Sequence, residues 1–452
     1  MKYSAYSDLL QSALHDLDKW RSSFGEFQSE ETDKDKMTQI IHDLTDRLKG
    51  NYPFHHPSYA GQMLKPPHPI AWIAYSLAAT VNPNNHALDG GPPTSVMEKE
   101  VTAKMAKMVG YSEYLGHLSS SGTFANLEAL WVLSHTLPKG KKVAYSSQAH
   151  YTHERICSVL HIPTINIPVL QNGEWDWSFI ETHKEGIGAF VVTMGTTGMG
   201  IIEPLEKVLK FKENQSIKIH VDAAYGGFFK LIEDELPSKN HWGLMSEADS
   251  IVIDPHKHGL QPYGCGCVLF KDPKVGLFYK HDSPYTYFSS DDLHLGEISL
   301  ECSRAGASAA AFWATLELFE LSKSGLGSII KFCRQAALKF ATEIQVEEKF
   351  SLVTEPELDI VVYYLKMAKS ASELSEMSRK LFNYGMNLPA DEGFHLSLFT
   401  IDSALIKAQS VDFVCDTNQT VVLRSVFMKP EQLEFIPELV RRLNSAIDSL
   451  NQ

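Results

Sequence analysis

Lys257 lies between two histidines, His256 and His258, in the motif DPHKHG. The motif follows an apolar, β-branched run at Ser250–Ile253, which predicts a buried strand that ends just before it. An amine at the mouth of an apolar core can attack an aldehyde, and the flanking imidazoles can donate to an anion. Taken alone, the motif is also compatible with an exposed loop that carries ordinary charges.

A second apolar run ends in an acid, Asp222, in the motif HVDAAYGG. In an open α/β sheet, ligands bind outside the carboxyl ends of the strands, so we expect Asp222 to face a ligand. The small residues beside it leave room for a flat molecule. An isolated aspartate more often caps the next turn, and the motif alone does not exclude that role.

Small hydroxylated residues precede a helical run in the sequence SSSGT, from Ser119 to Thr123. Backbone N–H groups and hydroxyls at a helix N-terminus suit a phosphate. A run of serines before a helix is more often only a cap, so this motif is weak by itself.

The three motifs come in chain order, each expected at a strand end of one sheet: a phosphate site, a carboxylate, then a lysine. Together they supply what pyridoxal phosphate needs. The amine holds the aldehyde as a Schiff base, and the carboxylate keeps the pyridine nitrogen protonated so that the ring can withdraw electrons. The combination therefore predicts that the chain binds pyridoxal phosphate through Lys257.

From about Tyr52 to the C-terminus, the chain resembles the pyridoxal-phosphate-dependent amino-acid decarboxylases, which include the glutamate, tyrosine, aspartate and aromatic amino-acid enzymes. The resemblance implies an aspartate aminotransferase-like α/β fold, with a mainly parallel seven-stranded-type sheet in a large domain and a small C-terminal α+β domain. It also implies a carboxy-lyase that converts an L-amino acid to its amine and CO2. It rests on the segments HPSYAGQM, GGPPTSVMEKEV, SSSGTFANLEAL, SSQAHYTHER, HVDAAYGG, DPHKHG and VLRSVFMKP.

The resemblance implies roles for residues around the cofactor ring. Lys257 would be the Schiff-base lysine, and Asp222 the partner of the pyridine nitrogen. Ala224 would pack under the ring while His150 stacks above it. The other implied cofactor-binding residues are Gly122, Thr123 and His256 at the phosphate, Thr196 in the pocket, and Ser303, which would reach the phosphate from the neighbouring subunit.

Asp254 departs from the pattern of the family, because many relatives carry asparagine at this position, next to a phosphate contact. A second acid there would repel the phosphate unless it points elsewhere or pairs with a base. The role of Asp254 is therefore open.

The α-carboxylate of a substrate must be held while it leaves, and a bidentate arginine suits that task. Arg424, in the apolar run Val421–Val426, is the candidate. The resemblance adds Gln62 as its partner. The alternative for Arg424 is an arginine on an edge strand that forms a surface ion pair.

A proton must replace the CO2 that leaves, at the same carbon. The resemblance implies a tyrosine on a loop after the lysine motif, or the stacked His150. In the sequence SPYTYFSS we select Tyr285 over Tyr287 as this catalytic residue.

Alternating apolar runs and helical patterns must position these residues. The spacing of Met97, Val101, Met105 and Met108 predicts an amphipathic helix, and one long helix is expected to begin near Ala305. Alternation of buried strands with helices is typical of a mainly parallel sheet in an α/β domain. Further strands are expected at 143–145, 189–192, 217–221, 250–253 and 267–270, and further helices after 123 and around 205–211.

A chain of 452 residues is too long for one compact core. We expect an N-terminal helical segment (1–60), a large domain that binds the cofactor (61–325) and a small C-terminal α+β domain (326–452). The N-terminal helices, expected between Ser7 and Leu48, have too little apolar content for a core of their own. We therefore expect them to pack on a partner chain, in a homodimer with active sites at the interface.

The net charge of −14 argues against a broad surface for nucleic acid or anionic lipid. No signal peptide or membrane segment is expected, which favours a cytoplasmic protein. The six cysteines show no zinc-finger spacing, so we expect structural thiols and no metal.

Other enzymes could use the same cofactor and lysine. An aminotransferase would protonate elsewhere and need two dissimilar substrates, and a carbon–carbon lyase of the sphingosine phosphate type shares the His-Lys pair. A non-enzymatic cofactor-binding protein would have to explain why the lysine, the acid and the stacking histidine are all present. The substrate is either aromatic, such as tyrosine, or acidic, such as glutamate or aspartate; an aromatic one is favoured because no extra basic residue stands out near Gln62.

Overall fold

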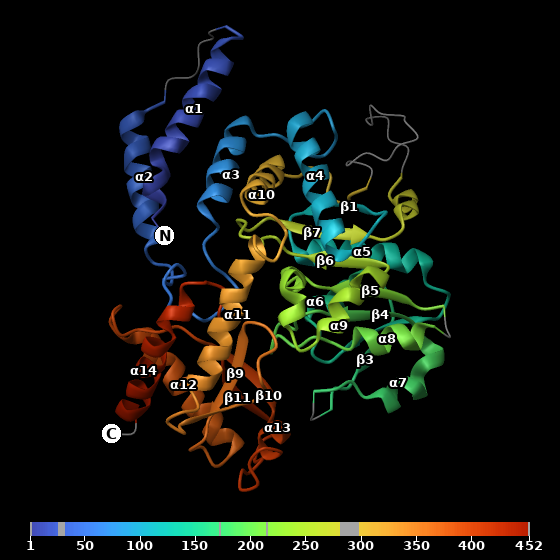
Figure 1. Ribbon diagram of the computed structural model, residues 1–452, viewed down its shortest axis with the longest axis vertical. Coiled ribbons are helices and arrows are strands. Elements are labelled where there is room, and N and C mark those ends of the chain that lie inside the picture. The colour runs from blue at the N-terminus through green and yellow to red at the C-terminus, as the bar shows by residue number, and fades with distance from the viewer. Residues whose placement is uncertain (1, 26–31, 171–172, 214–215, 281–297, 451–452) are drawn as a thin grey trace.

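A computed structural model describes residues 2–25, 32–170, 173–213, 216–280 and 298–450 of the chain. The molecule is elongated, with two N-terminal helices at one end and the C-terminal sheet at the other (Figure 1). The first residues of a third helix, α3 (Pro69–Val81), and of a fourth, α4 (Pro92–Val109), are prolines, which suit the first turn of a helix because it needs no N–H there.

The larger sheet has seven strands in the order β1-β7-β6-β5-β4-β2-β3. From β6 through to β3 all neighbours are parallel, and β7 runs antiparallel to both β6 and β1. The predicted mainly parallel sheet and the aspartate aminotransferase-like fold class are confirmed. The strands are β1 (Leu115–Ser119), β2 (Lys142–Ser146), β3 (Thr164–Ile167), β4 (Ile187–Thr193), β5 (Lys218–Asp222), β6 (Ser250–Ile253) and β7 (Gly266–Phe270).

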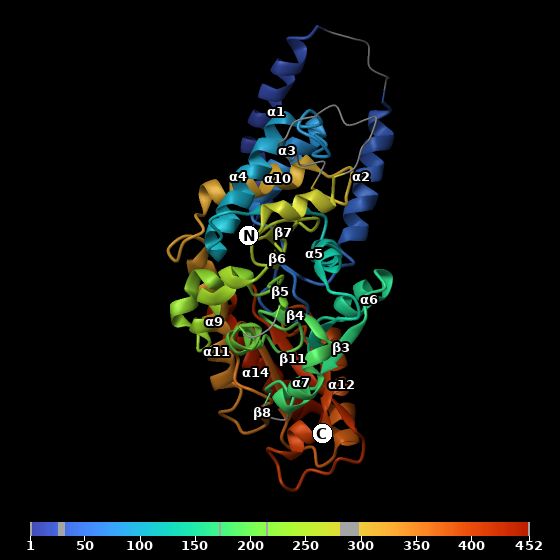
Figure 2. The same ribbon diagram turned by 90° about the vertical axis from the view of Figure 1, so that its right-hand side faces the viewer.

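Helices cover both faces of this sheet, with α5 and α6 on one side and α4 and α9 on the other (Figure 2). All seven residues of β4 are consequently buried, as expected of a central parallel strand. The helices in this part of the chain are α5 (Gly122–Thr136), α6 (Thr152–Val159), α7 (Trp177–His183), α8 (Leu205–Lys212), α9 (Lys239–Gly243) and α10 (Gly306–Leu318), with the 3-10 helices η2 (Lys184–Gly186), η3 (Gly227–Glu235), η4 (Leu244–Glu247) and η5 (Pro273–Phe278).

The smaller sheet is antiparallel, in the order β10-β11-β9-β8, and lies near the C-terminus. Ala60, which precedes the large sheet in the chain, is inserted between His395 and Val426 and so extends the small sheet. Its N–H donates to the carbonyl of His395 (2.8 Å), and its carbonyl accepts from the N–H of Val426 (3.0 Å). The elements here are β8 (Phe350–Leu352), β9 (Ile360–Leu365), β10 (Ser397–Asp402), β11 (Gln419–Val426), α11 (Leu326–Glu343), α12 (Ala371–Asn387), α13 (Ser403–Lys407) and α14 (Gln432–Leu450).

The helix expected to begin near Ala305 does begin at Gly306, but its expected length is wrong, because α10 ends at Leu318 and α11 follows as a separate helix. The chain turns between Phe319 and Gly325, where the N–H of Leu326 bonds to the carbonyl of Glu320. A side chain at Gly325 would collide with that carbonyl, so the turn requires glycine. The break lets α10 pack on α3 and α4 while α11 packs on α14.

The N-terminal helices α1 (Ser7–Ser22) and α2 (Lys34–Leu48), preceded by η1 (Tyr3–Tyr6), extend from the rest of the molecule (Figures 1 and 2). None of their described residues is buried. One stripe of α2 is apolar and between 48% and 58% exposed: Met37, Ile40, Ile41, Leu44 and Leu48. No described helix has the length and apolar character to cross a membrane.

Candidate active site

Asp222 is the last residue of β5, at the carboxyl edge of the large sheet. Its Oδ2 lies 2.8 Å from Nε2 of His153, and its Oδ1 accepts a hydrogen bond from the N–H of Ala224. Burial opposes the charge on Asp222, but the hydrogen bond from His153 and the charge of Lys257 together hold its pKa below the usual value. Asp222 is therefore an ionised carboxylate in a buried position.

Lys257 follows β6, and its Nζ lies 3.3 Å from Oδ2 of Asp254. The same oxygen lies 3.5 Å from Nε2 of His256. Asp254 therefore points toward two bases, which answers the question that its sequence position raised. The Lys257 side chain is 21% exposed, so it is not sealed in the core.

The N-terminus of α5 lies against Asp254. Ser121 caps the helix by accepting from the N–H of Phe124 (3.2 Å), and a side chain at Gly122 would collide with the Asp254 carboxylate. Thr123 is exposed, with its hydroxyl 3.5 Å from that of Thr152 in α6. Of the predicted phosphate residues, Gly122 and His256 thus lie against the Asp254 side chain, and Thr123 is the next residue after Gly122 in α5.

His150 precedes α6 and is partly buried. Its Nδ1 accepts from the N–H of Thr152 (3.2 Å), so the ring proton resides on Nε2. Burial lowers the pKa of His150, although the nearby charge of Asp222 opposes that change. His150 and Thr196, which follows β4, line one cavity of about 1310 Å³.

Arg424 lies in β11, and its guanidinium reaches across to the loop after β4. Nε donates to the carbonyl of Gly198 (2.9 Å), and Nη2 donates to the carbonyl of Thr197 (2.7 Å). Arg424 is only 5% exposed, and β11 lies between β10 and β9. The alternative of a surface ion pair on an edge strand is therefore wrong.

Gln62 lines the same cavity as Arg424, His150 and Thr196. Its N–H bonds to the hydroxyl of Tyr59 (3.1 Å), which holds the segment after the inserted residue Ala60. The structure thus brings into one cavity four predicted residues, of which the first, Gln62, and the last, Arg424, are 362 positions apart in the chain.

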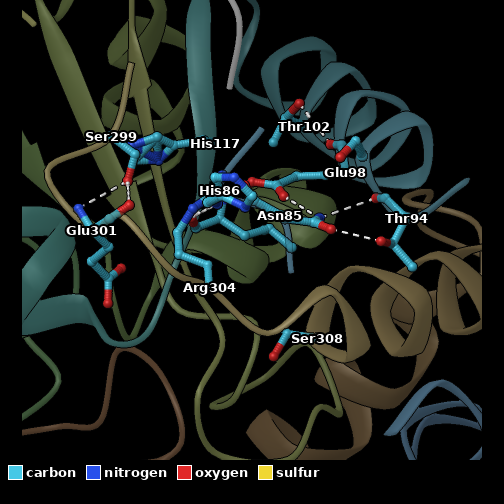
Figure 3. A network of polar contacts seen from close by, with 12 residues as sticks. Asn85, His86, Thr94, Glu98, Thr102, His117, Ser299, Glu301, Arg304 and Ser308 are labelled. Atoms are coloured by element: carbon cyan, nitrogen blue, oxygen red, sulfur yellow. Dashed lines mark hydrogen bonds and ion pairs between the residues drawn. The ribbon is translucent and has the colours of Figure 1, made fainter. Parts of the chain in front are cut away.

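Arg304, the residue after Ser303, lies in a network of polar contacts with Glu98 and Asn85 (Figure 3). Nη1 of Arg304 bonds to Oε1 of Glu98 (2.5 Å), and Asn85 donates to the other oxygen of Glu98 (2.6 Å). The hydroxyl of Ser303 accepts from the side chain of Asn84 (3.1 Å). Its role toward a neighbouring subunit stays a prediction, and Tyr285 and Tyr287 lie outside the described residues.

His153 was not selected from the sequence. It lies three positions after His150 in the segment SSQAHYTHER, which places the two histidines at neighbouring positions of one helical turn. That spacing was the available signal, since a second histidine on the same turn could reach the same strand end.

A sheet of this order, with a lysine and a buried carboxylate at its strand ends, defines a class: pyridoxal-phosphate enzymes of the aspartate aminotransferase-like fold. Residues 26–366 match the model of the pyridoxal-dependent decarboxylase conserved domain. The chain therefore belongs to the pyridoxal-dependent decarboxylase family. It is a carboxy-lyase that acts on an amino acid with pyridoxal phosphate as cofactor.

Curated relatives act on two kinds of amino acid. An L-tyrosine decarboxylase of Enterococcus faecium is 25% identical over 473 residues, which cover 79% of this chain and 77% of the relative. An L-aspartate decarboxylase of Thermococcus kodakarensis is 24% identical over 365 residues, covering 79% of this chain and 90% of the relative.

Solved structures of low identity share the fold. Oryza sativa TDC with PLP and tryptamine superposes with a TM-score of 0.79 at 15% identity, covering 97% of this chain and 98% of that one. Mouse CSAD gives a TM-score of 0.76 at 19% identity and covers 93% and 90% of the two chains.

The residues present fit pyridoxal phosphate. A carboxylate has about four acceptor positions, so Asp222 can still accept from a ring N–H after His153 and Ala224 are counted. Lys257 offers an amine just after the end of β6, and the helix N-terminus at Gly122 suits an anion. The acid at Asp254 does not break this fit, because it pairs with Lys257 and His256.

Proposed function

We propose that the enzyme removes the α-carboxyl group of an aromatic L-amino acid such as tyrosine. The observation that carries this proposal is the apolar wall beside Arg424. The ring of Phe399 packs closely against Gly198, because a side chain at position 198 would collide with that ring. The wall is formed by Met199, Leu398, Phe399 and Ile401, all of which line the cavity.

An acidic substrate is the second candidate, because L-aspartate decarboxylases are among the relatives. A second carboxylate would need another cation. Among the described residues that line the cavity, the lysines and arginines are Arg424 and Lys207. Lys207 pairs with Glu174 at 3.3 Å and lies 5.9 Å from the centre of the Trp177 ring. The aromatic substrate is therefore favoured.

In this proposal the large sheet supplies the cofactor site. Bound pyridoxal phosphate supplies an aldehyde that holds the substrate's amine and a ring that accepts the electrons left by CO2. Lys257 binds the aldehyde, Asp222 holds the proton on the ring nitrogen, and His150 and Ala224 contact the two faces of the ring. The phosphate and pocket residues are Gly122, Thr123, His256, Thr196 and, from the neighbouring subunit, Ser303.

The small sheet supplies the substrate site. Arg424, fixed by two carbonyls, holds the α-carboxylate, and Gln62 orients it from the inserted segment. Arg424 would thereby keep the carboxylate in one orientation while its bond to the α-carbon breaks. Tyr285 then delivers the proton to the carbon that lost CO2, with His150 as the alternative donor.

We also propose a homodimer, with residues 1–60 packed on the partner, 61–325 as the large domain and 326–452 as the small domain. The apolar stripe of α2 supports the first point, because an isolated helix gains little from exposing five large apolar side chains. Active sites at the subunit interface would then explain how Ser303 contributes to a phosphate site.

A panel of amino acids separates these possibilities. The purified enzyme, loaded with pyridoxal phosphate, is mixed with L-tyrosine, L-tryptophan, L-aspartate or L-glutamate, and CO2, amine and keto acid are measured. We expect CO2 and tyramine in equal amounts from L-tyrosine. CO2 from L-aspartate alone would favour the acidic candidate, and keto acid without CO2 would refute the proposed reaction.

A further inference from the structure

Ser397, the first residue of β10, lies directly opposite Arg424 of β11 in the register of the small sheet. Residues paired in this way point to the same face, with their Cβ atoms about 4.5–5.5 Å apart. Both residues line the cavity. The serine hydroxyl therefore lies on the cavity side, next to the base of the arginine side chain.

The hydroxyl of Ser397 is buried and has no hydrogen-bond partner among the described residues. Ser397 is 5% exposed as a whole. Burying a hydroxyl without a partner is unfavourable, so such a group in a binding cavity indicates that a ligand completes it. A hydroxyl both donates and accepts, so a carboxylate oxygen is a suitable ligand.

The guanidinium of Arg424 leaves room for the same ligand. The carbonyls of Gly198 and Thr197 take Nε and one N–H of Nη2. Nη1 makes no hydrogen bond with the part of the chain that the structure describes. A guanidinium has five N–H bonds, so the fork formed by Nη1 and the second N–H of Nη2 can bind a carboxylate with two parallel hydrogen bonds.

Gln62 approaches the same pair. Ala60 bonds to His395, two residues before Ser397, and to Val426, two residues after Arg424. Gln62 lines the cavity together with them. Three polar side chains from three separate segments therefore line the same cavity.

We propose that the Ser397 hydroxyl is a further substrate-binding group, which donates a hydrogen bond to the α-carboxylate held by Arg424. This inference rests on the proposed function of Arg424 and extends it. Because the carboxylate is the group that leaves as CO2, the hydroxyl favours the amino acid over its amine product. Ser397 thus contributes to the choice of a substrate that still carries its carboxyl group.

Ser397→Ala tests the proposal, with Ser425→Ala as the matched control. Ser425 lies beside Arg424 on the opposite face of β11, where its hydroxyl bonds to that of Tyr363 (3.1 Å). For each holoenzyme, KM and kcat are measured with L-tyrosine, together with the inhibition constant of tyramine, which lacks the carboxylate. If L-aspartate is the substrate found in the panel, it replaces L-tyrosine, with β-alanine as product.

We expect Ser397→Ala to raise KM about tenfold, as for loss of a hydrogen bond to a charged group, and to change the inhibition constant of tyramine less than about twofold. Its melting temperature should not fall, because the hydroxyl has no partner in the free protein. Ser425→Ala should lower the melting temperature and leave KM unchanged.

An unchanged KM in Ser397→Ala would overturn the proposal, and so would equal weakening of L-tyrosine and tyramine. Failure of the proposed function is distinguishable, because the unsubstituted enzyme would then release no CO2 from L-tyrosine or L-tryptophan.

Discussion

Nε2 of His153 lies 2.8 Å from Oδ2 of Asp222, and both side chains are buried. Since the carboxylate is the acceptor, His153 donates the hydrogen bond. Nδ1 of His153 has no partner among the described residues, so the contact with Asp222 is what fixes the ring. The carboxylate that we propose as the partner of the cofactor's ring nitrogen is thus itself oriented by a histidine three positions after His150.

Replacing His153 should weaken cofactor binding and stability together. His153→Phe leaves one oxygen of a buried carboxylate unpaired, which should lower the free energy of unfolding of the apoenzyme by about 1–3 kcal/mol. The dissociation constant of pyridoxal phosphate, measured by absorbance titration, should rise. His183→Phe, at an exposed position of α7, is the control and should change neither quantity. Unchanged cofactor affinity in His153→Phe would show that Asp222 does not need this partner.

Lys257→Arg should remove the covalent attachment of the cofactor and keep the fold. An arginine preserves the charge beside Asp254, but a guanidinium does not condense with an aldehyde. Borohydride treatment followed by mass spectrometry should therefore find the cofactor fixed to the unsubstituted chain and not to the variant. Lys271→Arg, which alters a lysine paired with Glu247 on the surface, should still be labelled. Labelling of Lys257→Arg would place the attachment at another lysine.

Arg424→Lys should raise KM for the amino acid roughly 30–100-fold, because a lysine cannot form the two parallel hydrogen bonds of a guanidinium. The matched control is Arg442→Lys in α14, where the arginine is also buried and bonds to Glu438 and to the carbonyl of Gly393. That control should lower the melting temperature with KM unchanged. If both variants raise KM equally, a general loosening of the small sheet is the cause.

Glu128 should make stability depend on pH. It is buried between His117 and Tyr279, and burial raises the pKa of Glu128 from 4.5 to about 8. Between these two values the folded chain keeps a proton that the unfolded chain has released. Stability therefore falls as pH rises through this window, by up to about 1.4 kcal/mol per pH unit from this group.

Urea unfolding of Glu128→Gln at several pH values inside that window measures the effect. The variant should be less sensitive to rising pH than the unsubstituted chain, because glutamine does not titrate. Glu181→Gln, at an exposed position of α7, should keep the original dependence. An identical pH dependence in Glu128→Gln would mean that this carboxyl titrates normally in the folded protein.

Ile41→Glu in the apolar stripe of α2 should convert a homodimer into monomers, since a charge would have to be buried in the contact. Light scattering after size-exclusion chromatography gives the mass. His42→Glu, also exposed on α2 but outside the stripe, should remain dimeric. A monomeric unsubstituted enzyme that is fully active would contradict the proposed assembly.

The strand-end motifs of the large sheet could be predicted from the sequence because each joins a buried apolar run to a residue of unusual chemistry. Asp222 ends β5 and Lys257 follows β6, as expected. β1, β3 and β10 were not predicted, since His117 in β1 and the polar residues of β10 interrupt the apolar pattern. These interruptions are explained only by long-range partners, such as Glu128 for His117.

The same reason hid part of the site. Arg424 was selected because its apolar flanks made it unusual, but Ser397 is an ordinary serine until the strand pairing places it opposite. The insertion of Ala60 between two strands likewise has no local signature, and without it Gln62 cannot be placed. A site residue whose position depends on strand register cannot be predicted from sequence motifs and hydrophobic periodicity alone.

The backbone of Arg424 is part of the small sheet, but its side chain is hydrogen-bonded to the loop that follows β4 of the large sheet. The hydroxyl of Tyr225 adds a second tie across the same junction, with 2.6 Å to Oδ1 of Asp359. A selection for enzyme variants with altered substrate affinity should therefore recover substitutions along this contact between the two sheets, as well as in the cavity wall. A design that changes β10 to admit a new substrate side chain must preserve the orientation of the Arg424 guanidinium. That orientation is set by the carbonyls of Thr197 and Gly198 in the loop after β4.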